Sequence, residues 1–459
     1  LLPFELTVAL FPPGSLPPLP EPWWGDCPPS NTSITPFRVH WSDEMISDLR
    51  ERILRRRKIT PSLRGAANTY GTNSDLLAHL LHYWAHEYDF KARENFLNSY
   101  PQYTTNIQGL RIHFIHVTPP NPHGKRVLPL LMLHGWPSNA FKFIRLMAYL
   151  MIDREDCDFV FEMIAPHLPG FGYSEATNKI GMANYQMGII MKNLMLRLGF
   201  PRFYIHANGL GQMVADKMAV LFSDKVLGLH TPFAVSLRPQ TIVKMLLGQL
   251  NPPAVVEPQY EQKMYPLSER AKYYIENMGY LHMHATRPDN VGHGIDDSPV
   301  AMLSWIMENV IAGAGVKKLL VVDMNMTDYY DTNVRFDMFT VSWDAQSMAT
   351  SIRAYAESLA VIQDPLLKTI SAAEMMMLYR TPSPVPLGVI HFGEEIMYQP
   401  DDFIRDKYPN LVHSASVDFG AHTSVYAYPE VLVDHLWTSV KKMEEFHATK
   451  GRNKCILGK

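Results

Sequence analysis

From about residue 105 onward, short apolar segments alternate with segments of helical periodicity. The apolar segments are bounded by Gly, Pro or other turn residues, and helical patterns separate them at 140–151, 184–199 and 210–222. Strands that alternate with helices favour a parallel sheet that helices cover on both faces. The predicted strands are Ile112–Val117, Val127–Leu133, Phe159–Ala165, Phe203–His206, Val226–His230, Leu387–Phe392 and Leu411–Val417.

This alternation stops between about residues 234 and 376. The pattern there is mostly helical, with expected helices at Tyr260–Met278, Pro299–Ala314 and Met348–Ile362, and it predicts an α-helical lid inserted into the core. We therefore expect an N-terminal extension over 1–104, the first part of the core over 105–233, the lid over 234–376 and the second part of the core over 377–459.

The N-terminal extension begins with a Pro-rich arm that ends at about residue 34. Such a run fits neither a helix nor a central strand, so we expect it to lie extended over the surface. Helices are predicted at Ser42–Arg57 and Leu76–Tyr88. The extension should therefore wrap the core.

Composition excludes some classes of function. The chain has 47% hydrophobic and 19% charged residues and a formal net charge of −3, and no basic run indicates a nucleic-acid partner. Its three cysteines show no metal-ligand spacing, so we expect neither a metal nor another cofactor.

One strand-to-helix turn has the layout of a nucleophile elbow. The strand Phe203–Ile205 leads into the turn, and a helical pattern follows it. An elbow needs small residues two places before and after its tip, because the backbone turns too sharply for bulk. Ala207 and Gly211 meet this requirement when Gly209 is the tip. The turn therefore has the frame of an enzyme but carries no nucleophilic side chain.

A second turn, His134-Gly135-Trp136-Pro137, directly follows a buried strand. A His-Gly turn at this place supplies a backbone N–H group to the oxyanion hole of an α/β-hydrolase. The alternative is an ordinary strand-to-loop turn.

Several sequence blocks, in the same order, resemble the microsomal epoxide hydrolase family. The resemblance extends from about residue 20 to 445 and implies an α/β-hydrolase fold with a mostly parallel, eight-stranded sheet. Two blocks, 23–25 and 402–409, are similar to its insect juvenile hormone branch. The other blocks that carry the resemblance are 97–103, 109–117, 133–137, 165–174, 279–289 and 297–300.

The resemblance implies roles for four side chains. His422 falls on the family's catalytic histidine, although Ala421 and Thr423 beside it depart from the family pattern. Glu395 falls on the carboxylate that orients this histidine, with Glu394 as the alternative. In the family the histidine activates the water that hydrolyses an ester intermediate. Tyr280 and Tyr355 fall on the two lid tyrosines that donate hydrogen bonds to the epoxide oxygen.

The resemblance breaks at the elbow. Gly209 falls on the family's nucleophilic Asp, while the pocket neighbours Asn208 and Leu210 replace Gly and Trp. Deamidation of Asn208 could supply an Asp, but its side chain leaves the backbone one residue early and should point away from the lid.

Three hypotheses follow. The first is a catalytically impaired protein that keeps a hydrophobic pocket and binds a lipophilic ligand such as a terpenoid, a fatty acid or a pigment. The second is an active epoxide hydrolase with a non-standard mechanism, and the third is a storage or structural protein.

The expected location rests on two glycosylation sequons, at Asn31 and Asn325. They favour the secretory pathway, with an extracellular or endoplasmic-reticulum destination. The family is anchored by an N-terminal helix, so membrane association through an anchor missing from this sequence stays open, as does a homo-oligomeric state.

Overall fold

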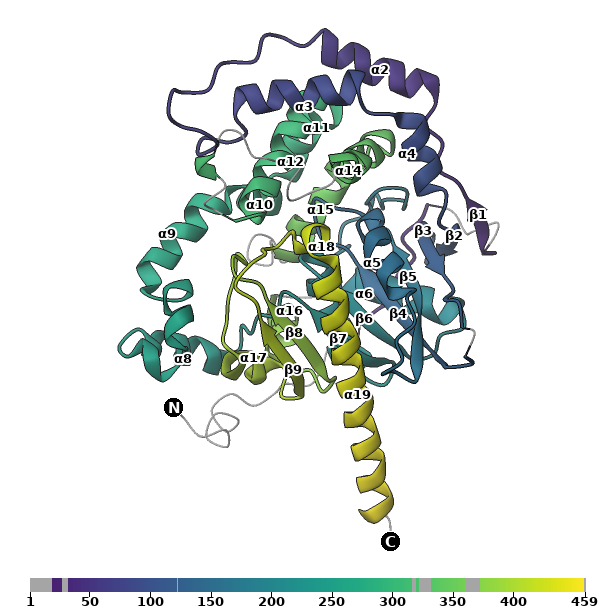
Figure 1. Cartoon of the computed structure of the whole chain (residues 1–459), viewed down its shortest axis with the longest axis vertical. Helices are drawn as coiled ribbons and strands as arrows, with labels where there is room; N and C mark the ends of the chain where they lie inside the picture. Colours follow the sequence, from purple (N-terminus) through teal and green to yellow (C-terminus); the bar gives the residue numbers. More distant parts are fainter. Residues whose placement is uncertain are drawn as a thin grey trace.

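The computed structural model of the chain describes residues 19–26, 32–121, 123–315, 319–321, 332–359 and 372–457. Its centre is a single mixed sheet, with the helices that follow the strands packed against it (Figure 1). The described strands lie in the order β1-β2-β3-β5-β4-β6-β7-β8-β9. Their bounds are β1 Thr35–Phe37, β2 Gln102–Ile107, β3 Leu110–Val117, β4 Arg126–Leu133, β5 Phe159–Pro166, β6 Phe203–Ala207, β7 Val226–Thr231, β8 Leu387–His391 and β9 Leu411–Ser416.

The sheet is mostly parallel, as the alternating pattern predicts. Every neighbouring pair from β5 through β9 is parallel, whereas the pairs β1–β2, β2–β3 and β3–β5 are antiparallel. The expectation of eight strands is corrected to nine within the described residues. The additional strand is β1, a three-residue edge strand from the N-terminal extension that pairs with β2, and it is too short to produce a recognisable pattern.

Four of the described helices form the main cover of the sheet. The helices are α5 Ile144–Leu150, α6 Asn184–Arg197, α7 Leu210–Leu221 and α19 Pro429–Leu457. Helices α6 and α7 pack on each other, and both are buried on nearly every side. Helix α19 runs along α5 and strands β7 to β9, and its C-terminal end projects beyond the sheet (Figure 1).

The lid is a helical layer between β7 and β8. Its helices are α8 Pro239–Gly248, η2 Pro252–Ala254, η3 Pro258–Lys263, α9 Leu267–Asn277, α10 Gly279–Thr286, α11 Pro288–Asp297, α12 Pro299–Gly313, α14 Thr332–Asp344, α15 Met348–Leu359 and α16 Ala372–Arg380. The predicted helix Tyr260–Met278 is divided, because Pro266 lies before the first turn of α9 and cannot continue a preceding helix. Part of the predicted helix Met348–Ile362 lies outside the described residues.

The N-terminal extension packs on the lid as well as on the core. Helices α2 Asp43–Leu54 and α3 Ser74–His86 contact lid helix α12, and α4 Phe90–Leu97 follows them (Figure 1). The side chain of Ser42 caps α2 by accepting a hydrogen bond from the Met45 amide. Trp84 Nε1 donates to Thr340 Oγ1 at 3.0 Å, which ties α3 to α14. The extension therefore helps to hold the lid in place.

Three short helices complete the described structure: η1 Ala140–Phe143, α17 Asp401–Lys407 and α18 Ser424–Ala427. Both glycosylation sequons, at Asn31 and Asn325, lie outside the described residues. No helix in the described part of the chain combines the length and the apolar character that crossing a membrane requires.

The turn between β6 and α7 depends on a close approach of two backbones. A Cβ atom added to Gly211 would lie 2.4 Å from the carbonyl oxygen of Leu133 and 2.5 Å from that of His134. Only glycine fits at such distances. The first turn of α7 is therefore seated directly against the end of β4.

We predict that Gly211→Ala destabilises the protein by about 1–3 kcal/mol, because the added methyl group must displace backbone. Gly294→Ala in α11 is the matched control, because a Cβ there meets nothing within 4 Å. That control should gain about 0.5–1 kcal/mol from helix propensity. Denaturant unfolding of both variants tests the prediction, and equal stabilities would contradict it.

Candidate active site

Gly209 occupies the tip of the turn between β6 and α7. Its backbone has φ +53° and ψ −129°, a conformation that L side chains rarely adopt. The turn thus has the strained geometry of a nucleophile elbow. It presents no side chain at the point where an elbow presents its reactive atom.

His422 and Glu395 form a hydrogen-bonded pair facing this turn. They follow β9 and β8, whose carboxyl ends lie at the same edge of the sheet. His422 Nδ1 lies 2.8 Å from Glu395 Oε1. Glu394, the alternative acid, points toward Gly315 instead. Its carboxylate lies so close to Gly315 that a Cβ atom added there would collide with it. The geometry therefore favours Glu395 as the group that orients His422.

The His422 ring approaches Gly209 closely. A Cβ atom built on Gly209 would lie 3.1 Å from His422 Nε2, which is tighter than most Cβ contacts. Any side chain at this position requires the ring to move by a few tenths of an ångström. The imidazole therefore partly fills the space next to the elbow.

The His134–Pro137 turn contributes its backbone to the site but not its histidine. Gly135, Trp136 and Pro137 line the cavity above the elbow. The Gly135 Cα lies 3.5 Å from a Cβ built on Gly209. The His134 ring is buried, with Nδ1 3.0 Å from the Gly135 carbonyl oxygen, and Nε2 accepts the Leu168 amide hydrogen at 3.1 Å. Burial lowers the His134 pKa to about 3, so this ring is neutral and fixes the turn.

The two lid tyrosines line the same cavity from α10 and α15. The Tyr280 ring stacks on Trp136 at a centroid distance of 5.6 Å and lies edge-on to Tyr355 at 6.3 Å. Burial raises the pKa of Tyr280 to about 12 and raises that of Tyr355 well above its usual value. Both hydroxyl groups therefore remain protonated at neutral pH and available as donors.

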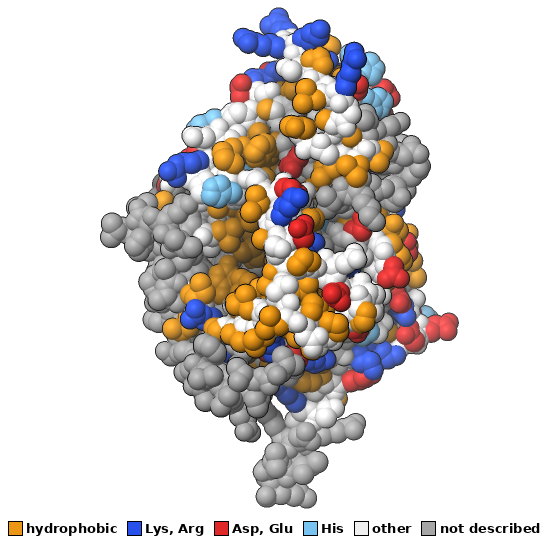
Figure 2. Space-filling view, turned by 90° about the vertical axis from the view of Figure 1, so that its left-hand side faces the viewer, with side chains coloured by type: hydrophobic (Ala, Val, Ile, Leu, Met, Phe, Trp, Pro, Cys, Tyr) orange, Lys and Arg blue, Asp and Glu red, His pale blue; other side chains and the backbone are white. Residues whose placement is uncertain are grey.

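The elbow, His422 and the two lid tyrosines line one cavity of about 530 Å³. Besides the predicted site residues, its wall is largely apolar, with Phe233, Leu237 and Met278 among the lining residues. It follows α7 from Leu210 to Lys217, a rise of roughly 10 Å. Figure 2 shows apolar side chains gathered in the middle of the face on which α8 and α9 lie. A cavity of this size and character suits a lipophilic small molecule.

The structure thus brings most of the predicted site residues around one space. Asn208, Gly209, Leu210, Tyr280, Tyr355 and His422 all line the cavity together with Gly135, Trp136 and Pro137. Glu395 lies behind His422, and His134 does not reach the cavity.

Lys142 is a cavity residue that the sequence reasoning missed. It is only 6% exposed, and its Nζ donates a hydrogen bond to Asn208 Oδ1 at 2.9 Å. Burial alone lowers its pKa to about 7. The sequence does carry a signal for this buried lysine: Lys142 stands between Phe141 and Phe143 in an apolar segment. A lysine in such a place is unusual, because lysines are rarely buried without a partner.

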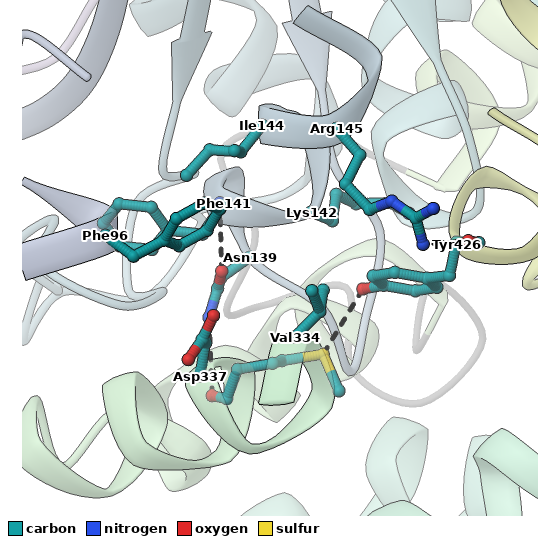
Figure 3. A pocket seen from close by; sticks show the side chains of 10 residues that line it. Phe96, Asn139, Phe141, Lys142, Ile144, Arg145, Val334, Asp337 and Tyr426 are labelled. Atoms are coloured by element: carbon teal, nitrogen blue, oxygen red, sulfur yellow. Dashed lines mark hydrogen bonds between the residues drawn. The ribbon is translucent and has the colours of Figure 1, made fainter. Parts of the chain in front are cut away.

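Lys142 also borders a second space, of about 10 Å³, together with Arg145, Val334, Asp337 and Tyr426 (Figure 3). That volume is about that of one water-sized probe. Of these two spaces, the larger one has the volume for an organic ligand.

A second polar group lies farther along the large cavity. Lys217 Nζ contacts Asp216 Oδ2 at 2.6 Å, and Tyr408 donates to Asp216 Oδ1 at 2.8 Å. Lys407 lies 3.3 Å from the same carboxylate. The polar positions of α7 suggest a solvent-facing side, yet Lys217 is fully buried.

Similarity to known proteins places this site in a family. A family model described as "Epoxide hydrolase N terminus" matches residues 34–143. A juvenile hormone epoxide hydrolase of Manduca sexta is 39% identical over 95% of this chain and 94% of the relative. The chain belongs to the microsomal epoxide hydrolase family. Epoxide hydrolase 1 of Oryctolagus cuniculus is 35% identical over 90% of this chain and 91% of its own length.

Solved structures confirm the predicted fold. The crystal structure of juvenile hormone epoxide hydrolase from the silkworm Bombyx mori matches with a TM-score of 0.88 and 35% identity, over 93% of this chain and 99% of that chain. The Aspergillus niger epoxide hydrolase structure matches with a TM-score of 0.71 over 92% of this chain and 98% of that chain, at 22% identity. This family member therefore has the α/β-hydrolase fold, with a mixed, mostly parallel sheet and a helical insert.

The buried ammonium of Lys142 should make stability depend on pH. Between pH 7 and its usual pKa of 10.5, the unfolded chain binds a proton at this lysine that the folded chain does not bind. The free energy of unfolding therefore rises by about 1.4 kcal/mol per pH unit in that window. Below pH 7 the folded protein bears the full cost of burying the charged ammonium. We predict that Lys142→Met is more stable than the wild type at about pH 6.

The difference in stability between Lys142→Met and the wild type should shrink toward about pH 9, because Lys142 is then neutral in the folded wild type. Denaturant unfolding of both proteins across this range measures the difference. A constant difference at every pH would show that Lys142 does not fold with a lowered pKa.

Proposed function

We propose that this chain is a catalytically impaired member of the microsomal epoxide hydrolase family that binds a lipophilic ligand in its cavity. The observation that carries the proposal is Gly209 at the elbow tip, opposite the His422–Glu395 pair. The sequence resemblance assigns this position to the nucleophilic Asp. A glycine there cannot form the ester intermediate on which the family's reaction depends.

The remaining groups can perform only part of that reaction. Tyr280 and Tyr355 can donate hydrogen bonds to an epoxide oxygen, and His422 can accept a proton from water. Neither action replaces a covalent bond to the epoxide carbon. Removing the nucleophile of a covalent hydrolase costs on the order of a millionfold in rate.

The cavity supports the ligand-binding part of the proposal. Its volume of about 530 Å³ lies within the range of small-molecule sites, and most of its wall is apolar. Leu237, a lining residue, is half exposed, and the neighbouring helix α8 exposes Leu246 and Leu247. Exposed apolar side chains beside a cavity suit the entry of a lipophilic molecule. A terpenoid, a fatty acid or a pigment fits this description, and the names of the relatives add juvenile hormone to the candidates.

A second candidate function is epoxide hydrolysis by direct attack of water. The 2.8 Å contact between His422 and Glu395 favours it, because this pair is built to activate water. Under this alternative, His422→Ala would abolish diol formation by the otherwise unchanged protein. Under the first proposal the wild type forms no diol, so the variant changes nothing.

We predict that Gly209→Asp gains epoxide opening that the wild type lacks, because it returns a carboxylate to the elbow beside His422. Gly209→Asn is the matched control, because it has the same shape and the same backbone strain but no nucleophile. Diol formation from a lipophilic epoxide is measured for all three proteins. Only Gly209→Asp should form the diol, and Gly209→Asp/His422→Ala should accumulate the ester.

Turnover by the wild type and by Gly209→Asn would contradict the proposed impairment. Inactivity of a folded Gly209→Asp variant would locate a further defect, such as the His422 ring that already fills space beside the elbow. Detection of the trapped ester by intact-protein mass spectrometry separates loss of the first step from loss of the second.

The proposal also predicts that purified protein carries or takes up lipophilic molecules. Organic extraction followed by mass spectrometry should recover compounds that a Leu281→Trp variant, with its cavity partly filled, retains at least several-fold less. Equal recovery from both proteins would place the bound compounds outside the cavity.

A further inference from the structure

The wall of the large cavity carries one ammonium group without an anionic partner. Lys142 Nζ has a single hydrogen-bond acceptor among the described residues, the neutral side-chain oxygen of Asn208. No carboxylate in the described part of the chain lies within ion-pair distance of it, and burial is the only cause of its altered pKa. An unpaired buried charge is costly, so its retention calls for a counter-charge from elsewhere.

The other lysines on the described cavity wall each contact a carboxylate. Lys217 and Lys407 share the Asp216 carboxylate, and Lys407 also donates to two backbone carbonyl groups. His422 pairs with Glu395. Lys142 is therefore the lysine on the described cavity wall that has no carboxylate.

The nearest candidate acid on the opposite side is also occupied. Asp337 borders the small space beyond Lys142 (Figure 3), but its Oδ1 accepts hydrogen bonds from Arg93 Nε at 2.8 Å and from the Tyr88 hydroxyl at 2.7 Å. Among the described residues around that space, none supplies an unpaired carboxylate to Lys142.

Among the described residues that line the cavity, none at the elbow tip carries a carboxylate. Asn208 and Gly209 stand side by side there, and both are neutral. A carboxylate on residue 209 would repel a second carboxylate in the same space, and glycine removes that repulsion. From this end the cavity follows α7 for roughly 10 Å to the Asp216–Lys217 pair, and apolar residues such as Phe233 and Met278 form other parts of its wall.

We propose that the ligand is a lipophilic carboxylic acid whose carboxylate pairs with Lys142 at the elbow end, while its hydrocarbon part lies along α7. This inference rests on the proposed ligand-binding function and specifies the class of ligand. A charge-assisted hydrogen bond in a water-poor cavity discriminates strongly between an acid and its neutral ester.

The test compares palmitic acid with methyl palmitate, because the two share a chain and differ in the carboxyl charge. Delipidated full-length protein is titrated with each compound below its aggregation limit, by displacement of a fluorescent apolar probe. The wild type should bind the acid at least tenfold more tightly than the ester. Lys142→Met should lose this preference and keep the ester affinity, which also shows that the variant is folded.

Two further lysines serve as controls. Lys192 is buried but pairs with Glu21 at 2.6 Å and does not line the cavity, so Lys192→Met should leave both affinities unchanged. Lys217→Met tests the position of the carboxylate, because Lys217 lies about two turns along α7 from the elbow. It should keep the preference for the acid.

The outcomes separate the two proposals. Equal binding of acid and ester by the wild type overturns the carboxylate assignment but leaves ligand binding intact. Loss of the preference in Lys217→Met alone overturns the assignment to Lys142. Failure of the wild type to bind either compound, or the probe itself, contradicts the proposed ligand-binding function.

Discussion

The seating of α7 against the end of β4 is the constraint on which the site depends. Gly211 lies so close to the carbonyl oxygens of Leu133 and His134 that the chain must turn sharply between β6 and α7. That turn holds Gly209 at φ +53° directly beneath His422 and next to Gly135. The elbow and the His-Gly turn are therefore held together by one backbone contact, which needs no side chain at residue 209.

Much of this arrangement was predictable, because it follows from the order of strands. Glu395 and His422 each follow a parallel strand, and the carboxyl ends of such strands meet at one edge of a sheet. The apolar runs also located the parallel strands, since buried strands have nearly continuous apolar sequences. Choosing Glu395 over Glu394 could not be decided by pattern alone, because both follow β8 closely and only the local backbone directs one of them to His422.

The features that sequence reasoning missed are those in which polar residues become buried by distant parts of the chain. Strand β2 is rich in Thr, Gln and Asn and lies next to the edge strand β1, and it lacks an apolar run. Asp216 and Lys217 occupy polar positions of α7 that a helical pattern assigns to solvent. They are buried instead, with Tyr379 of α16 against Lys217 and with Lys407 and Tyr408, at the end of α17, against Asp216. Lys142 is buried for the same reason. The periodicity of apolar and polar residues separates the two faces of a helix. It does not predict which distant segments pack on the polar face.

The charges around the elbow connect the proposed loss of catalysis with the proposed gain of a ligand class. In an enzyme with a nucleophilic carboxylate, the elbow supplies the negative charge and the cavity receives a neutral epoxide. In this chain the elbow tip is a glycine, and the same wall holds Lys142, whose hydrogen-bond acceptor among the described residues is the Asn208 amide oxygen. Glu395 is hydrogen-bonded to His422 and makes no ion pair with Lys142 among the described residues. Under the two proposals, the elbow tip supplies no carboxylate, and a ligand that brings one would pair with Lys142.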